Sequence, residues 1–367
     1  MQTSKKSIGA VIGRFSMVHN QHERMFQQMA SENSHVLIML GSSNRCISPK
    51  NPFSFEQRKT FVLAVIAQFM DAANVRIVPL PDRIYTEGRW EAKVQQHVDA
   101  YAEDLDVTDA RISMYGNEKD HTGYWQRNFP QWKRVDIGLH EMIHATELRD
   151  IWFGANQTLP IAGDGLTKRL AGSIPVGMQQ YLRIAHEFNP DLQKDWEAYR
   201  NENYKFAGYP YRNGEDHLNV MCGDAVVECA GHILTVTRNA SPGKGIKALP
   251  GGHKKAWETS VECALRELLE ETNLRIPLRV LRNCIRNKNL FDHPARNVGS
   301  VSRSTTGVHI KLEPREDGSL PRAKGGDDAK NDHLPNGGCE WVKIDDILSG
   351  KVILFDDHSD IVDFFVK

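Results

Sequence analysis

The sequence lacks most of the features of a secreted or membrane-embedded protein. Its six cysteines include no C-x-x-C pair, which argues against both a disulfide framework and a zinc ribbon. No apolar stretch reaches the roughly 18 residues that a transmembrane helix needs. The first apolar run contains Gly and Arg and is too short for a signal peptide. We therefore expect a cytoplasmic protein that has no membrane partner.

The charge balance is also without a strong bias. Lys and Arg total 46 and Asp and Glu total 47, so the net charge is −1. Such a chain has no basic field for gripping a polyanion, and nucleic acid is not expected as a partner. The hydrophobic fraction of 40% is ordinary for a globular protein, and 367 residues predict two domains.

Apolar runs alternate with helical patterns in the first half of the chain. Strands are expected at 7–15, 35–40, 75–80 and 111–115, and helices at 21–31, 55–69 and 90–102. The second helix opens with Ser54-x-x-Gln57, a capping-box pattern. Alternating strands and helices predict an α/β fold with a parallel sheet, and ligands of such sheets bind at the carboxyl ends of the strands.

The pattern changes near residue 182, where a polar helix leads into an aromatic-rich connector. Strand-like runs return at 225–236, 307–312 and 339–344, together with a Glu-rich helix. We expect a first domain at 1–190, a connector at 191–210 and a second domain at 211–367.

The end of the first expected strand carries the first group of chemically informative residues. Gly13-Arg14-Phe15 is followed by His19 and His22 at the start of a helix. A glycine lets a ligand approach the backbone, and a helix N-terminus attracts anions. Two imidazoles and a guanidinium there suit a phosphate chain. On spacing alone, a metal half-site and a pair of solvated histidines remain alternatives.

The segment GRFSMVHNQH resembles the G-R-F-x-P-x-H-x-G-H motif of nicotinamide mononucleotide adenylyltransferases, with Met17 in place of Pro and Gln21 in place of Gly. Segments 40–59, 115–132 and 144–150 also resemble blocks of that family. The resemblance implies a Rossmann-like nucleotidyltransferase that transfers the adenylyl group of ATP to nicotinamide mononucleotide, giving NAD and pyrophosphate.

The same resemblance implies roles for individual residues. It places ATP contacts at Gly13, Arg14, Phe15, His19, His22, Thr146 and Arg149, of which His19, His22 and Arg149 neutralise charge during the reaction. It places nicotinamide mononucleotide contacts at Asn117, Lys119, Asp120 and Trp125. Trp125 and Phe129 are candidates for stacking on the nicotinamide ring, and packing in the core is the alternative for both. Mg²⁺ is expected to bridge the phosphates.

The Glu-rich helix carries three carboxylates, Glu267, Glu270 and Glu271, within five residues. They share one stripe of the helix, and the apolar residues occupy a separate arc. Like charges at i,i+4 repel by about 0.2–0.5 kcal/mol, so the arrangement costs stability unless a cation offsets it. A solvated acidic face is the alternative.

Glycine and arginine at fixed distances from these carboxylates favour a metal site. Gly252 lies six residues before Glu258, and Arg266 lies eight residues after it. The pattern G-x5-E-x7-R-E-U-x-E-E, with U aliphatic, resembles the Nudix box, except that Asn273 replaces the last glycine. Because Asn tolerates left-handed backbone conformations, we expect the turn after the helix to survive.

The Nudix resemblance implies an α/β/α domain with a mixed sheet. Glu267 and Glu271 would be the main metal ligands, Glu270 would assist, and Arg266 would orient Glu258. Mg²⁺ is expected, with Mn²⁺ as an alternative, because both prefer hard oxygen ligands. The general base is left open, with Glu316, Asp317, Asp327 and Asp328 as candidates.

Segments 240–252, 291–300, 325–333 and 355–362 resemble Nudix domains fused to nicotinamide mononucleotide adenylyltransferases. That bifunctional family implies hydrolysis of ADP-ribose to AMP and ribose 5-phosphate, whereas the box alone indicates only a nucleoside diphosphate linked to another group. Two alternatives stay open: the same folds acting on another mononucleotide and another nucleoside diphosphate, or a non-catalytic sensor of ADP-ribose or NAD. The oligomeric state is also open, with a homo-oligomer as one option.

Overall fold

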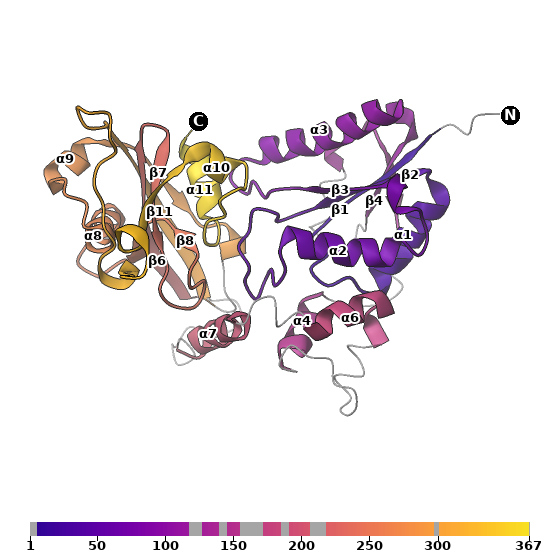
Figure 1. Ribbon diagram of the computed structural model, residues 1–367, viewed down its shortest axis with the longest axis horizontal. Coiled ribbons are helices and arrows are strands. Elements are labelled where there is room, and N and C mark those ends of the chain that lie inside the picture. Colours follow the sequence, from indigo (N-terminus) through magenta and orange to yellow (C-terminus); the bar gives the residue numbers. More distant parts are fainter. Residues whose placement is uncertain are drawn as a thin grey trace. The chain divides into compact units, whose positions relative to one another are not determined.

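The computed structural model describes residues 6–116, 127–138, 145–154, 172–184, 191–205, 218–296 and 301–366. The chain divides into two compact units (Figure 1). The first comprises Met1–Ser43, Pro49–Arg83 and Glu87–Gln193, and the second comprises Asn44–Ser48, Ile84–Thr86 and Lys194–Lys367. Two short loops of the N-terminal half thus cluster with the second unit. The domain limits expected at 190 and 211 stay a prediction.

The first unit is built on a five-stranded sheet in the order β3-β2-β1-β4-β5, and every pairing is parallel. Its strands are β1 (Ile8–Gly13), β2 (His35–Leu40), β3 (Val75–Pro79), β4 (Ile112–Gly116) and β5 (Lys133–Asp136). Gly13 lies opposite Leu40, so β1 and β2 end side by side. The expected Rossmann-like parallel sheet is confirmed, and its carboxyl edge carries the β1–α1 turn.

Helices cover both faces of this sheet, with α3 on one face and α1 and α2 on the other (Figure 1). Among the described residues, the helices of this unit are α1 (Asn20–Glu32), α2 (Phe55–Ile66), α3 (Glu87–Leu105), α4 (Ala145–Gly154) and α6 (Val176–Ile184). The capping box of α2 is confirmed: the Ser54 hydroxyl accepts the Gln57 amide at 3.3 Å, and Gln57 Oε1 accepts the Ser54 amide at 2.8 Å. Phe129 is buried in the core against Trp132, with ring centroids 4.9 Å apart, which favours the packing role for this residue.

The second unit contains a seven-stranded mixed sheet with the path β10-β11-β6-β7-β12, to which β8 and β9 are added. The strands are β6 (Leu218–Cys229), β7 (His232–Thr237), β8 (Lys247–Ala248), β9 (Gly251–His253), β10 (Ile285–Phe291), β11 (Val301–Leu312) and β12 (Cys339–Lys343). β6 and β11 are parallel, and the other pairs are antiparallel. The run expected at 225–236 is a hairpin, because Ala230 and Gly231 both adopt positive φ angles, 43° and 74°.

Helices lie on both faces of the second sheet, with α8 and α9 on one side and α10 and α11 on the other (Figure 1). They are α8 (Ser260–Thr272), α9 (Leu278–Asn283), α10 (Ile344–Leu348) and α11 (His358–Phe365), and α7 (Leu192–Lys205) precedes the sheet. The apolar side of α8 packs on β6 and β11 through Ala264, Leu265 and Leu268. The expected α/β/α layering with a mixed sheet is confirmed.

The two inserted loops, Asn44–Ser48 and Ile84–Thr86, contact acidic residues at and near α11. Arg45 forms a 2.6 Å ion pair with Asp360, and both side chains are buried. The Tyr85 hydroxyl donates to Asp357 at 2.6 Å, and Asp357 also pairs with the buried Arg296. The last helix of the chain is therefore held by side chains from the first 90 residues.

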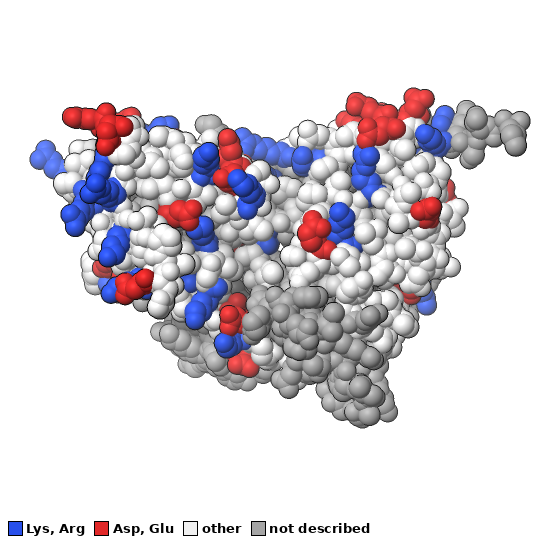
Figure 2. All heavy atoms as spheres, viewed as in Figure 1, with Lys and Arg blue, Asp and Glu red and all other residues white. Residues whose placement is uncertain are grey.

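Three surface and covalent features complete the description. No helix in the described part of the chain is long and apolar enough to cross a membrane. All six cysteines are free, as their spacing predicts. Basic and acidic side chains are interspersed on the face seen in Figure 2, in keeping with the balanced composition.

Candidate active sites

The turn after β1 explains why glycine precedes the arginine and phenylalanine there. Phe15 has a left-handed backbone, with φ of 47°, and its ring folds back over Gly13. A Cβ on Gly13 would come within 2.7 Å of that ring. The Phe15 ring in turn lies 4.9 Å from the His22 ring, centroid to centroid. This turn therefore positions the histidines at the start of α1.

His19 and His22 lie together at the N-terminus of α1. His19 is the N-cap residue, and the two rings stack with centroids 3.7 Å apart. His22 Nδ1 accepts the backbone N–H of His19 at 3.4 Å. Burial, followed by the neighbouring His19, lowers the pKa of His22 well below its usual value. Without an anion nearby, the His22 ring is therefore neutral at pH 7.

Arg149 adds a buried cation to the first unit. It lies on α4 with 7% of its surface exposed. Burial, followed by the positive charge of Arg14, lowers the pKa of Arg149 to about 10. Two guanidinium groups that disfavour one another form a place where an anion is stabilised. Thr146 lies one turn earlier, as the second residue of the same helix, and its side chain is not among those that the structure describes.

Arg58 was not singled out from the sequence, yet it holds the strand ends of this site. Its guanidinium donates to the carbonyl oxygens of Arg14 and Gly41, both at 2.7 Å, and to that of Ser42 at 3.4 Å. The sequence could have indicated this residue, because Phe61, Val62 and Val65 follow Arg58 at the spacing of one helix face, and all three are buried. A charge on the apolar stripe of a helix must find partners inside the protein.

Other expected residues of the first site have different outcomes. Gln21, which replaces the family's glycine, is buried and donates from Nε2 to the carbonyl oxygen of Gly138 at 2.8 Å. Its amide thus ties α1 to the segment after β5. The expected mononucleotide contacts, Asn117, Lys119, Asp120 and Trp125, lie outside the described residues.

Arg266 is the centre of an ion-pair network in the second unit. It donates to both carboxylate oxygens of Glu258, at 2.9 Å and 2.7 Å. Its Nη1 also contacts Glu267 at 2.8 Å and Glu270 at 2.9 Å. The hydrogen bonds from Arg266 lower the pKa of Glu258 to about 2. The network fixes the loop before α8 against the acidic stripe of that helix.

Glu267 and Glu271 lie against the glycine pair at the start of β9. Glu271 Oε2 accepts the Gly251 amide at 3.0 Å, and a Cβ on Gly252 would come within 2.5 Å of Glu267 Oε1. Burial raises the pKa of both carboxyl groups, that of Glu271 to about 8. A side chain at position 252 would therefore displace the Glu267 carboxylate from this position.

Asp224 is a second residue that the sequence did not reveal. It lies on β6, is 5% exposed, and contributes to the raised pKa of Glu271. A Cβ on Gly251 would come within 2.0 Å of Asp224 Oδ1, so this carboxylate also packs on the glycine pair. A single Asp within an apolar strand carries no pattern that would have identified it.

The carboxylates of Glu267 and Glu271 suit a divalent cation in kind, since they supply hard oxygen donors that are half-buried and carry raised pKa values. Within the described ranges, no three His, Cys, Asp or Glu side chains are gathered closely enough to hold a metal ion. Glu267 and Glu270 instead turn toward Arg266.

The turn after α8 forms as expected. Asn273 adopts a left-handed conformation, with φ of 44° and ψ of 35°, and this prediction is confirmed. Of the four candidates for the general base, Glu316, Asp317 and Asp327 are exposed, and the side chain of Asp328 lies outside the description.

Comparison with known proteins gives one family match, two similar sequences and one similar solved structure. Residues 222–360 match the NUDIX domain family. A nicotinamide-nucleotide adenylyltransferase of Thermococcus onnurineus is 26% identical over 141 residues, which are 38% of this chain and 70% of that protein. That of Pyrococcus abyssi is 31% identical over 74 residues, 20% of this chain and 40% of that protein.

A solved structure matches both units together. The bifunctional NMN adenylyltransferase/ADP ribose pyrophosphatase of Francisella tularensis, complexed with AMP and a Mn ion, covers 98% of this chain and 98% of its own. Its identity is 26% and its TM-score is 0.81. The parallel sheet of the first unit and the box of the second agree with this match. The chain therefore carries a NUDIX domain at residues 222–360, and over both units it is similar to a bifunctional NMN adenylyltransferase/ADP ribose pyrophosphatase.

Proposed function

We propose that the chain is a bifunctional enzyme of NAD metabolism. The first unit would transfer the adenylyl group of ATP to nicotinamide mononucleotide, and the second would hydrolyse ADP-ribose to AMP and ribose 5-phosphate. The observation that carries the proposal is that one chain holds a cationic site at the carboxyl edge of a parallel sheet and a carboxylate site on the NUDIX helix. The names of the similar proteins support both activities.

In the first reaction, a phosphate oxygen of nicotinamide mononucleotide attacks the α-phosphorus of ATP. The bond from that phosphorus to the oxygen bridging to the β-phosphate breaks, and pyrophosphate leaves. No covalent intermediate is needed, so positioning and neutralisation of charge supply most of the rate. Arg149, His19 and His22 would contact the phosphates, and the approach of that negative charge favours protonation of the buried His22.

In the second reaction, water attacks one phosphorus of the ADP-ribose pyrophosphate. The bridging P–O bond breaks, and AMP and ribose 5-phosphate are released. Glu267 and Glu271 would hold a divalent cation, with Glu270 and Asp224 nearby, and Mg²⁺ is the cation we propose. When bound, such a cation polarises the pyrophosphate and acidifies water. Arg266 holds the Glu258 loop and the start of the carboxylate stripe in place.

The test is analysis of products by chromatography in the presence of Mg²⁺. One reaction contains nicotinamide mononucleotide and ATP, and another contains ADP-ribose. The unchanged chain is compared with His22→Ala and Glu271→Gln. We expect the first variant to lose NAD formation and keep AMP formation, and the second to do the reverse.

Two results would contradict the proposal. If a single change abolished both activities, the sites would not be independent. If the unchanged chain turned over neither substrate but bound ADP-ribose, the sensor alternative would replace the enzyme. Reaction with another mononucleotide in place of nicotinamide mononucleotide would keep the fold and change the assigned substrate.

A further inference from the structure

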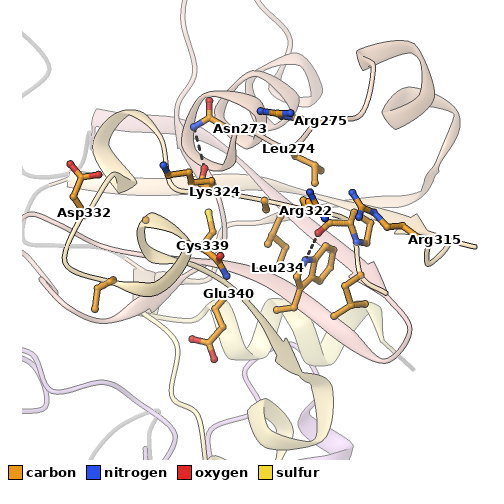
Figure 3. A pocket seen from close by; sticks show the side chains of 17 residues that line it. Leu234, Asn273, Leu274, Arg275, Arg315, Arg322, Lys324, Asp332, Cys339 and Glu340 are labelled. Carbon is orange, nitrogen blue, oxygen red and sulfur yellow. Dashed lines mark hydrogen bonds between the residues drawn. The ribbon is translucent and has the colours of Figure 1, made fainter. Parts of the chain in front are cut away.

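A cavity opens in the second unit, beside the C-terminal end of α8 (Figure 3). It encloses about 1260 Å³. Its walls come from the turn after α8, from the segments 315–324 and 332–341, and from β7. We call it the basic pocket, because four cations line it: Arg275, Arg315, Arg322 and Lys324. None of the NUDIX-box residues Glu258, Arg266, Glu267, Glu270 and Glu271 lines it.

The charges of the basic pocket are not balanced from within. In the part of the chain that the structure describes, none of its four cations forms an ion pair, although the charge of Arg315 lowers the pKa of nearby Asp317 after the hydrogen bonds from Ser319. Its two acidic residues are already neutralised, since Glu340 pairs with Lys247 and Asp332 pairs with Lys330.

The cations and the acids also lie apart. Figure 3 shows the three arginines, Arg275, Arg315 and Arg322, on one side of the pocket and Asp332 and Glu340 on the other. The arginine side of the cavity is therefore an uncompensated cationic surface. Arginine favours phosphate in such a position, because its planar guanidinium can donate two parallel hydrogen bonds to phosphate oxygens.

An apolar floor lies beside these cations. Leu234 on β7 is fully buried and pairs directly with Trp341 on β12. The indole Nε1 of Trp341 donates to the carbonyl oxygen of Pro321 at 2.9 Å, which fixes the orientation of the ring. A half-buried, oriented aromatic ring beside a cationic wall suits a ligand that has both a flat ring and a charged chain.

The rim of the basic pocket is tied to the last turn of the NUDIX helix. The Lys324 amide donates to the carbonyl oxygen of Thr272 at 2.8 Å, and Asn273 Nδ2 donates to that of Lys324 at 3.1 Å. The Gly326 amide donates to the carbonyl oxygen of Glu271 at 2.8 Å. A ligand in this pocket therefore contacts the segment that holds the end of α8.

We propose that the basic pocket binds a nucleotide that carries two or more phosphate groups, as a site separate from those of the two reactions. The arginines contact the phosphates, and the Trp341 side contacts the base. The volume exceeds the roughly 300–1000 Å³ of pockets for drug-sized molecules, so it accommodates a ligand of this size. A nucleic acid strand fits less well, because the cations are confined to one cavity in a chain of net charge −1.

The test is hydrogen-exchange mass spectrometry of the full chain with ATP in EDTA, which suppresses metal-dependent turnover. The variant Arg315→Ser/Arg322→Ser is compared with a control of equal charge change, Arg286→Ser/Lys288→Ser, on β10 at the opposite edge of the sheet. ATP should protect peptides from 315–324 and 334–341 in the unchanged chain and the control. In the pocket variant, the ATP concentration for half protection should rise at least about tenfold.

Several outcomes would overturn the proposal. One is the absence of protection of these peptides at saturating ATP. Another is an equal loss of protection in the pocket variant and in the control variant, which would indicate a general effect of charge. If tripolyphosphate protected these peptides as well as ATP does, the base would contribute nothing to binding, and the proposed contact with the base would be wrong. An oligothymidylate that protected at lower concentration than ATP would indicate a nucleic acid surface. A tenfold rise in the KM for ADP-ribose in the pocket variant would make the pocket part of the substrate site. The binding readout stands even if ADP-ribose is not a substrate.

Discussion

Replacing Arg58 by methionine tests whether this buried guanidinium organises the first site. Methionine keeps the apolar stem of the side chain and removes the donors to the carbonyl oxygens of Arg14 and Gly41. These oxygens lie at the ends of β1 and β2, where the Gly13–Phe15 turn begins. We expect the rate of adenylyl transfer to fall strongly, whereas the unfolding free energy of the first unit should change little.

Two opposing contributions of Arg58 to stability are similar in size. Leaving two buried carbonyl oxygens without donors costs about 1–3 kcal/mol each. Burial lowers the pKa of Arg58 to about 10, which means that its charge is itself destabilised by about 3 kcal/mol at roughly 1.4 kcal/mol per pKa unit. The net loss of unfolding free energy is therefore about 3 kcal/mol or less. A shift of about 1 Å in the released turn can cost roughly 100-fold in rate.

The assay measures NAD formation, with ADP-ribose hydrolysis as the internal control. Stability of the first unit is followed by hydrogen exchange of β1 and β2 peptides in increasing urea, because a chain of two units does not give one two-state transition. Lys59→Met removes a positive charge from the same helix and serves as the matched variant. Full adenylyl transfer by Arg58→Met, or a stability loss above about 4 kcal/mol, would refute this reasoning.

Three further predictions concern single positions in both units. Gly252→Ala places a Cβ 2.5 Å from Glu267 Oε1, and we expect ADP-ribose hydrolysis to fall about 100-fold while NAD formation is unchanged, as measured by product chromatography. The pKa of His22 is depressed in the folded chain, so that, as the pH falls, the unfolded chain takes up this proton before the folded chain does. The contribution of the neutral His22 to the unfolding free energy at pH 7.5 should therefore be lost as the pH falls below about 6.5. Hydrogen exchange of β1 and β2 peptides in urea, measured between pH 7.5 and 5, should show that the unfolding free energy depends less steeply on pH for His22→Asn. Asn273→Ala should lower the unfolding free energy by about 1–2 kcal/mol more than Asn273→Gly, because alanine resists the left-handed conformation.

Each of these predictions has its own control. Gly88→Ala adds a Cβ that meets nothing within 4 Å and should leave both activities intact. If the unfolding free energy depends on pH equally with and without His22, other titratable groups cause the loss of stability at acidic pH. Equal unfolding free energies for Asn273→Ala and Asn273→Gly, measured in urea, would show that the turn relaxes to another conformation.

The regular parts of the fold follow from local patterns in the sequence. The strands that were expected at 7–15, 35–40, 75–80 and 111–115 form within three residues of those limits, because each contains a compact apolar run, although β3 at the sheet edge is only partly buried. β5 was not expected, since KRVD is short, polar and at the edge of its sheet. The hairpin at 230–231 depends on two backbone angles that no apolar pattern encodes.

The sites were predictable to the extent that they depend on sequential neighbours. His19 and His22 lie on one turn of α1, and Glu267, Glu270 and Arg266 lie on one stretch of α8, so spacing alone brings them together. Arg58 and Asp224 reach their sites from other elements of the fold. Their burial is decided by tertiary packing, which a single sequence does not reveal.

The contacts of Arg45 and Tyr85 mean that the two halves of the chain are not interchangeable modules. A chain shortened to begin at residue 194 would contain the whole NUDIX box and would lack both side chains. The carboxylates of Asp360 and Asp357 would then keep their burial and lose, respectively, a cation and a hydrogen-bond donor. The second unit therefore includes these two loops, and a partner grafted in place of the first unit would have to supply an equivalent pair of loops.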